Sequence, residues 1–147
     1  MAIEVKLKHI IISFILASYF LVSSGVCSVK YKNININGVP FKLEVADSQE
    51  ERETGLSGRV LKQNEGMLFV FERPCRPAFW MKGVLEPLDI VWIDDEKKVV
   101  GVLERLPVCR GDDCDIYRPS SKICYAIELK GGISGALKLK TGQVLDI

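Results

Sequence analysis

The stretch from residue 66 to residue 94 constrains the fold of this chain most strongly. It is apolar and rich in aromatic residues, but proline, glycine and charged residues divide it into short runs. Short apolar runs bounded by such residues are typical of β-strands. Two charged residues, Lys82 and Asp89, lie directly among the hydrophobic ones. The stretch therefore predicts a strand-rich core into which two charges are built.

The same pattern continues on both sides of this stretch. Residues 41–45 alternate apolar and charged side chains, as a half-buried strand does. We expect a hairpin connection at residues 94–98 and a final hairpin that pairs 138–139 with 144–145 around Thr141-Gly142. The remaining expected strands are residues 67–71, 78–82, 88–94, 99–106 and 123–129.

One short helix interrupts the strands. Asp47 or Ser48 can cap its start, with Glu50 or Glu51 in the capping-box position, and Gly55 can end it. Six or seven short strands with one short helix predict a mainly β (α+β) domain, built as a small β-barrel or sandwich.

Residues 1–27 have the pattern of a targeting segment. Two lysines form a basic start, residues 10–22 are a run of thirteen apolar or small residues, and Ser-Ser-Gly follows. A helix that spans a membrane needs roughly 20 residues. A cleaved signal peptide is therefore the prediction, while a retained N-terminal anchor and lipidation at Cys27 stay open. Each alternative exports residues 28–147 to the periplasm or out of the cell.

Residues 28–147 are enough for one compact domain and too few for two. The whole chain has 20 basic and 19 acidic residues, and the leader holds two lysines and one glutamate, which leaves 18 of each sign. A neutral domain without a basic stripe has little long-range attraction to phosphate backbones. We therefore expect no nucleic-acid partner, and membrane contact only through a retained N-terminal segment.

Cysteine usage agrees with export, because an even set in an oxidising compartment predicts disulfides. Cys109 and Cys114 enclose four residues and can close a tight loop, which leaves Cys75 to pair with Cys124. A zinc site is the weaker alternative, since this spacing lacks a second matching pair and any histidine. We expect two disulfides, no metal and no other cofactor.

The only histidine, His9, lies in the leader. The domain after it therefore lacks the side chain needed for Ser-His-Asp and Cys-His catalysis and for histidine metal sites. It also contains neither a Walker loop nor a dinucleotide-binding glycine turn. An enzyme built on this chain would depend on carboxylates, Lys, Arg or Tyr, and we favour a function without catalysis.

Two carboxylates, Asp89 and Glu128, each lie between two large apolar residues. Burying such a charge is costly unless it is paired with an opposite charge. The candidate partner cations are Lys82 and Arg59. On an extended strand Trp80 and Lys82 share one face, while Phe79 and Met81 share the other. Phe79 and Met81 then belong to the core, and Trp80 and Lys82 can line a groove.

Two interpretations of these charged residues and Trp80 compete. In the functional one, they form a ligand site, or Asp89 and Glu128 form a carboxylate pair for acid/base catalysis. In the structural one, the charges form a buried ion network that sets the register of the sheet, because structural ion pairs perturb charges just as active sites do. No catalytic residue is assigned beyond these two candidates. The candidate ligand-binding residues are Arg59, Trp80, Lys82, Asp89 and Glu128.

The motif GLSGR at residues 55–59, the block at 66–94 and YAIEL at 125–129 together resemble the bacterial and archaeal family called domain of unknown function 192, or uncharacterised protein family 0127. The resemblance covers roughly residues 41–147. It implies a fold and a compartment, and the family has no established activity. The family motif W-M-K-N-T is Trp80-Met81-Lys82-Gly83-Val84 here, so the amide and the hydroxyl beside the lysine are lost. In addition, Ser57 stands where Met is common in the family.

We interpret the chain as an exported domain of the cell envelope that binds a small polar, sugar or peptide ligand or serves as an accessory module. A carboxylate-dependent hydrolase that uses Asp89 and Glu128 is the first alternative. A structural partner of another envelope protein is the second. The hydrolase requires both carboxyl groups to face one open cleft, while the accessory module requires an exposed apolar patch.

Overall fold

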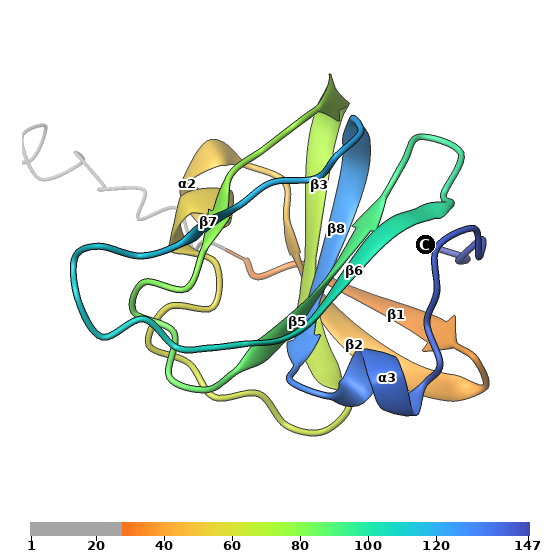
Figure 1. Ribbon diagram of the computed structural model, residues 1–147. Helices are drawn as coiled ribbons and strands as arrows, with labels where there is room; N and C mark the ends of the chain where they lie inside the picture. Colours follow the sequence, from red (N-terminus) through yellow and green to blue (C-terminus); the bar gives the residue numbers. More distant parts are fainter. Residues whose placement is uncertain (1–27) are drawn as a thin grey trace, which may run out of the picture.

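The computed structural model describes residues 28–147, and the predicted leader at residues 1–27 lies outside the described residues (Figure 1). The described part contains eight β-strands and two short helices. In chain order these are β1 (Tyr31–Ile36), β2 (Val39–Ala46), α2 (Gln49–Thr54), β3 (Glu65–Cys75), β4 (Phe79–Trp80), β5 (Leu88–Ile93), β6 (Val99–Leu106), β7 (Ile116–Tyr117), β8 (Ile123–Lys130) and α3 (Ile133–Ala136). The predicted mainly β fold is confirmed as a sandwich-like one with two helices rather than one, and the sheet does not close into a barrel.

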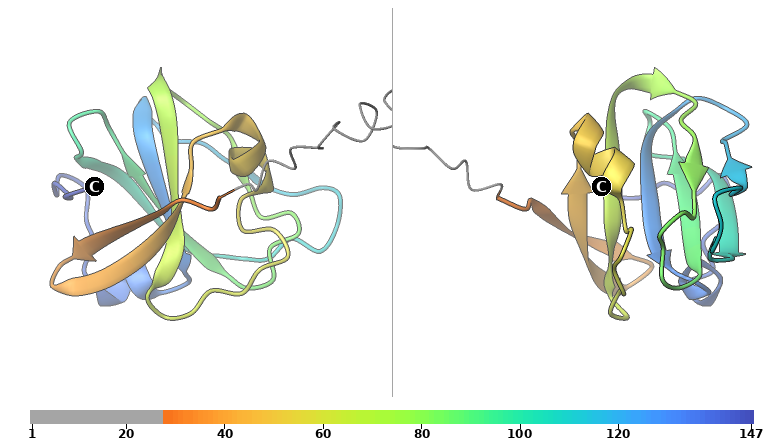
Figure 2. Two further views of the ribbon diagram at one scale, coloured as in Figure 1. Left: turned by 180° about the vertical axis from the view of Figure 1, so that it is seen from behind. Right: turned by 90° about the vertical axis from the view of Figure 1, so that its left-hand side faces the viewer.

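Six strands form one mixed sheet in the order β1-β2-β3-β8-β5-β6, and β4 pairs with β7 in a separate ribbon. Neighbours in the large sheet are antiparallel except β2 and β3, which are parallel because α2 and a loop return the chain between them. Figure 1 shows these strands fanning out, with α2 and β7 toward one side and α3 with the C terminus toward the other. The views in Figure 2 show the β4–β7 ribbon as a second layer beside the large sheet.

The large sheet is covered on both faces. The side that carries Phe69, Ile90 and Trp92 packs against Phe79 and Met81, and we call it the β4 face. The opposite side, which we call the α3 face, packs against α3 and the C-terminal segment through residues such as Leu139 and Leu145. All six residues of β5 are buried, as expected for a strand with cover on both faces.

The predicted strand at residues 78–82 is shorter in the structure, but its alternation is confirmed. Phe79 and Met81 are buried in the core of the β4 face, while Trp80 and Lys82 are exposed. Only Phe79 and Trp80 pair with β7, and Lys82 makes a single bridge to Cys109. This segment therefore presents one apolar face to the core and one mixed face to the surroundings.

The predicted C-terminal hairpin is wrong. Residues 138–139 and 144–145 do not pair with each other, and α3 precedes them instead. The final segment turns at Thr141-Gly142 and then bonds to the hairpin between β5 and β6, where Val99 donates to the Gln143 carbonyl and Leu145 donates to the Lys97 carbonyl. β6 lies at an edge of the sheet, so the backbone N–H and C=O of Val99 are free to bond the final segment, and Leu139 and Leu145 are buried.

The disulfide between Cys109 and Cys114 is present, as predicted. The predicted bridge between Cys75 and Cys124 is not formed, since both are free cysteines. The pairing of β3 with β8 explains this, because an irregularity after Val70 places Cys75 opposite Ile123 rather than opposite Cys124. Neighbouring residues of a strand point to opposite faces, so the two sulfur atoms are not aligned for a bond.

Candidate functional site

A cavity of about 210 Å³ opens on the β4 face of the large sheet, between α2, β3 and the β4 segment. Four aromatic residues line it: Phe69, Phe71, Phe79 and Trp80. Phe69 and Phe79 meet edge to face with ring centres 5.5 Å apart, which holds this part of the wall in place. The polar lining residues are Gln49, Arg52, Glu53, Thr54, Ser57, Lys82 and Glu128. The cavity is thus aromatic in its walls and polar over part of its lining.

Glu128 is the buried polar group of this cavity. It lies on β8 between Met67 of β3 and Ile90 of β5, and its residue surface is only 6% exposed. Its carboxyl group has no hydrogen bond or ion pair to any other side chain within residues 28–147. Burial therefore raises the pKa of Glu128 to about 8. At neutral pH this group is a protonated carboxylic acid that can donate one hydrogen bond or, after losing its proton, hold a cation.

Trp80 and Lys82 lie at the exposed part of the same cavity. Trp80 is 42% exposed and thus offers part of its ring to solvent or to a ligand. The Lys82 ammonium forms an ion pair of 2.8 Å with Asp112, which belongs to the loop closed by the Cys109–Cys114 disulfide. Both side chains of this ion pair are exposed to solvent, and the predicted contact of Lys82 with a buried carboxylate does not occur.

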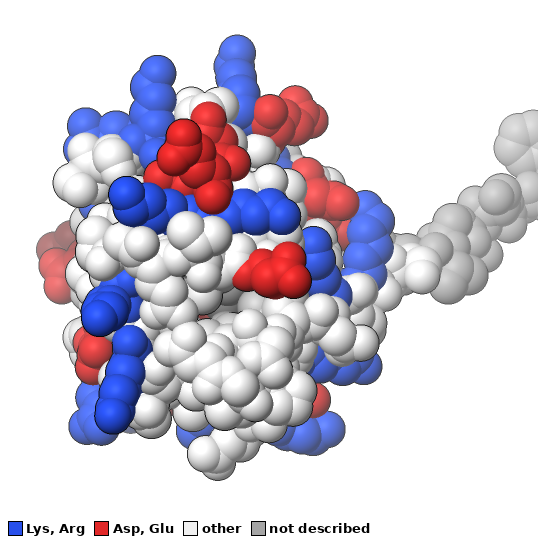
Figure 3. Space-filling model, turned by 90° about the vertical axis from the view of Figure 1, so that its right-hand side faces the viewer, with Lys and Arg blue, Asp and Glu red and all other residues white. Residues whose placement is uncertain are grey.

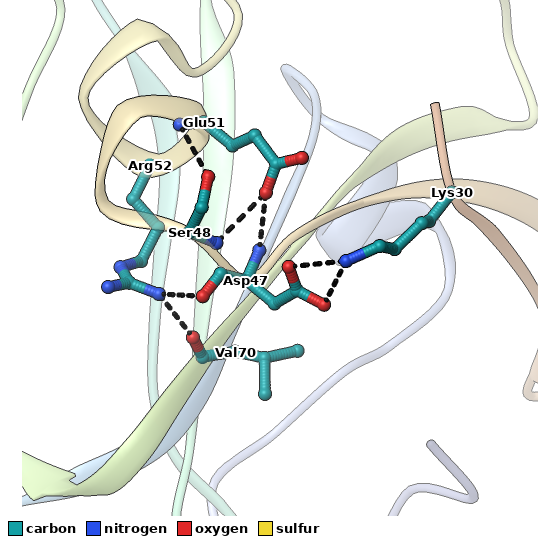
Figure 4. Close-up of polar contacts among 6 residues, drawn as sticks. All are labelled: Lys30, Asp47, Ser48, Glu51, Arg52 and Val70. Atoms are coloured by element: carbon teal, nitrogen blue, oxygen red, sulfur yellow. Dashed lines mark hydrogen bonds and ion pairs between the residues drawn. The ribbon is translucent and has the colours of Figure 1, made fainter. Parts of the chain in front are cut away.

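Helix α2 brings Arg52 to the cavity, and its start is held by a full capping box (Figure 4). Ser48 accepts a hydrogen bond from the Glu51 backbone, and the Glu51 carboxylate accepts from the backbones of Ser48 and Asp47. These hydrogen bonds from Ser48, with help from Asp47, lower the pKa of Glu51 to about 2. Of the residues offered by the sequence for these roles, Ser48 is the cap and Glu51 the capping-box residue.

The guanidinium of Arg52 is fixed by the backbone. One of its nitrogens donates to the carbonyls of Asp47 at 2.6 Å and Val70 at 2.9 Å, as Figure 4 shows. The same guanidinium lies over the ring of Phe71, 5.4 Å from its centre. Arg52 therefore joins α2 to β3 along the rim of the cavity and has a fixed position there.

Asp89 lies away from the cavity. Its side chain is fully buried on the α3 face, where it accepts hydrogen bonds from the backbones of Arg105, Gly132 and Ser134 at 2.7 to 2.8 Å and from the Ser134 hydroxyl at 2.6 Å. The predicted cation partner, Arg59 or Lys82, is wrong. Four hydrogen bonds satisfy this carboxylate instead, and they tie the start of α3 to β5 and β6.

Arg59 also lies outside the cavity. Its two terminal nitrogens bind both carboxylate oxygens of Glu44 on β2, one of them at 2.9 Å. Hydrogen bonding to Glu44 raises the pKa of Arg59. Of the five predicted site residues, the structure therefore brings Trp80, Lys82 and Glu128 together and places Arg59 and Asp89 elsewhere.

Sequence reasoning missed the contribution of α2 and β3 to the cavity. Arg52 and Glu53 looked like the exposed side of a short helix, and Phe69 and Phe71 looked like ordinary core residues of a strand. One signal was available, because Phe69 and Phe71 alternate on the strand that pairs with the strand of Glu128.

Residues 28–147 contain neither a metal-binding cluster nor a helix that could span a membrane. No group of three or more His, Cys, Asp or Glu side chains there has the geometry to hold a metal ion. No helix in this part of the chain is long and apolar enough to cross a membrane.

Comparisons with known proteins agree with the fold. The family model for domain of unknown function 192, described as an uncharacterised ACR, matches residues 32–147. A protein of unknown function from Novosphingobium aromaticivorans is similar in structure with a TM-score of 0.72 and 22% identity, over 84% of this chain and 89% of that one. A putative transcription regulator from Sinorhizobium meliloti has a TM-score of 0.70 and 26% identity, over 83% of this chain and 97% of that one. No curated protein matches the sequence.

Proposed function

We propose that this chain, which belongs to the domain of unknown function 192 family, is an exported domain of the cell envelope that binds a small ligand in the cavity above Glu128. The observation that carries the proposal is the carboxyl group itself. It is buried, it lines an open cavity, and no side chain of residues 28–147 satisfies it. A buried polar group without a partner costs free energy, and a ligand that supplies the partner recovers that cost.

The chemistry of the walls suggests how such a ligand is held. Four aromatic side chains provide contact for an apolar body, and Glu128 provides one polar anchor at depth. Small-ligand sites commonly combine apolar walls with a few placed polar groups and a group of perturbed pKa. A cavity of about 150 Å³ with apolar walls holds benzene, and the present one of about 210 Å³ has room for a molecule slightly larger than that.

The geometry does not favour the hydrolase. Asp89 faces the α3 face together with Val91 and Ile93, whereas Glu128 faces the β4 face. A pair of catalytic carboxyl groups must flank one bond of the substrate, and these two are separated by the sheet.

An accessory role has one observation in its favour. Trp80 and Ile116 lie opposite each other on the β4–β7 ribbon, and both are exposed, by 42% and 60%. An exposed aromatic and an exposed aliphatic side chain in register form the kind of apolar surface that another envelope protein can bind. Replacing Ile116 with Ser should then remove partner binding without changing small-ligand binding.

Export is part of the proposal and rests on the leader pattern at residues 1–27 together with the Cys109–Cys114 disulfide. The absence of a nucleic-acid partner is also proposed, because residues 28–147 have balanced charges and the side in Figure 3 intermixes both signs. Intact-mass measurement of protein from the envelope fraction tests the leader. The mature species should lack it, and a dominant species that begins at Met1 would point to a retained anchor.

Binding itself is tested by NMR with a library of small neutral and cationic compounds. Binders should shift the amide signals of Phe69, Trp80 and Glu128. The variant Ala78→Phe fills the cavity from its wall and should abolish these shifts, whereas Ala136→Phe on the exposed side of α3 should leave them. The proposal fails if no compound shifts the cavity signals, or if compounds bind the Ala78→Phe variant unchanged.

A further inference from the structure

The cavity combines a buried acid with aromatic walls, and this combination selects among ligand classes. We infer that the ligand is an organic cation, with an alkylammonium or quaternary ammonium group that lies beside the Glu128 carboxylate and against the rings of Phe69, Phe79 and Trp80. The inference rests on the proposed function and names the class of ligand for the same site.

The aromatic walls favour a cation. The faces of aromatic rings attract cations, and several rings around one acid form the type of site that takes quaternary ammonium groups. The four rings come from two different elements, β3 and the β4 segment, and thus line the space from two sides. A neutral apolar ligand would gain from the same contact area, but it would leave the acid at the floor without a partner.

The buried acid Glu128 favours a cation as well. A carboxyl group can neutralise a bound cation, whereas an anion in the same place would be repelled once the group ionises. Across the strands Glu128 is flanked by the apolar residues Met67 and Ile90, whereas the other carboxylate of the cavity, Glu53, is an exposed residue of α2. Asp89, the other buried carboxylate, is satisfied by four hydrogen bonds on the opposite face.

The charged groups at the rim do not prevent cation binding. Arg52 and Glu53 face the cavity from α2, and Lys82 faces it from the β4 segment, while β3 and β5 contribute no charged group. Lys82 is paired with Asp112. With Glu128 ionised, the two cations Arg52 and Lys82 are outnumbered by three carboxylates. These carboxylates are Glu53, Glu128 and Asp112, and a bound cation balances the one negative charge in excess.

Cation binding has a consequence that can be measured, because the empty site holds a proton. Glu128 is protonated at neutral pH, since burial raises its pKa to about 8. A cation that binds beside the carboxylate releases this proton to the solvent, and no bond of the ligand is made or broken. Affinity for a cation should therefore rise with pH up to about 8 and then level off, whereas affinity for a neutral ligand should not rise.

Three probes of nearly equal shape test the inference: choline, its neutral isostere 3,3-dimethylbutan-1-ol, and the anion 3,3-dimethylbutanoate. None of them titrates between pH 6 and pH 9, so a pH dependence in that range belongs to the protein. In calorimetric titrations, choline should bind best of the three and gain roughly a hundredfold in affinity from pH 6 to pH 9. At pH 7 its binding should release close to one proton, measured in two buffers of different ionisation enthalpy.

Two matched variants locate the effect. Glu128→Gln keeps the shape of the side chain and should remove both the preference for choline over the alcohol and the pH dependence. Glu53→Gln removes another carboxylate of the same cavity and should leave both in place. If the alcohol binds as tightly as choline at every pH, or if choline does not bind, the ligand is not an organic cation. The proposed function would still stand on neutral compounds found by NMR, and it fails separately if those also leave the cavity signals unchanged.

Discussion

Asp89 and Glu128 lie one position apart in the register of the neighbouring strands β5 and β8, yet they point to opposite faces of the same sheet. Asp89 pairs with Leu129, and Glu128 pairs with Ile90. One carboxylate is satisfied by four hydrogen bonds, and the other lines a cavity without a partner side chain in the described part of the chain. Two residues with the same sequence environment thus have different physical roles.

Asp89→Asn should destabilise the fold strongly. The amide keeps the shape, but its NH2 group would face backbone N–H donors, so at least one of the four hydrogen bonds becomes a contact between two donors. Hydrogen bonds to a buried charged group are worth about 1.5 to 3 kcal/mol each, and we expect a loss on the order of 3 kcal/mol. Urea denaturation near neutral pH measures it, with the exposed Asp95→Asn as control. An unchanged or raised midpoint for Asp89→Asn would contradict a structural role.

Glu128→Gln should have the opposite effect on stability. Folding raises the pKa of Glu128 from 4.5 to about 8. The free energy of unfolding therefore falls as pH rises from about 4.5 to about 8, and the loss stays constant at higher pH. The variant lacks this cost and should be more stable than the wild type by on the order of 3 kcal/mol at pH 7 and about equally stable at pH 4. Urea midpoints measured from pH 4 to pH 9 should diverge accordingly. Parallel curves for the two proteins would show that Glu128 has an ordinary pKa.

The four cysteines of residues 28–147 should behave in two ways. Peptide mapping without reduction should recover Cys109 linked to Cys114 and should recover Cys75 and Cys124 as thiols. Alkylation of the native protein should reach the half-buried Cys75 before the buried Cys124, because access limits the reaction. Free thiols at Cys109 and Cys114 in the native protein, or a Cys75–Cys124 linkage, would contradict the structure.

The strands of the central sheet could be predicted because each is a local pattern. Apolar runs between turn residues placed β5, β6 and β8, and period-two alternation correctly assigned Phe79 and Met81 to the core. The helix start followed from the spacing of Ser48 and Glu51. In each case the decisive contacts are made within a few residues of one another.

The errors arose where distant segments compete. The last residues bond to the β5–β6 hairpin rather than to each other, and Asp89 finds its donors at Arg105, Gly132 and Ser134, far along the chain. The first strand was missed because asparagines accompany Ile34 and Ile36 in it. Trp80, Lys82 and Glu128 could be named as candidates, but only the fold brings them to one cavity.

Glu128 is a buried acid without a partner side chain in residues 28–147, and a single NMR titration of its side-chain carboxyl carbon tests this directly. In the empty protein the carboxyl should titrate near the pKa of about 8 that burial gives it. With saturating choline the titration should move well below neutral pH, because the bound cation favours the ionised form. A carboxyl that titrates near 4.5 in the empty protein, or whose titration choline leaves unchanged, would contradict the account.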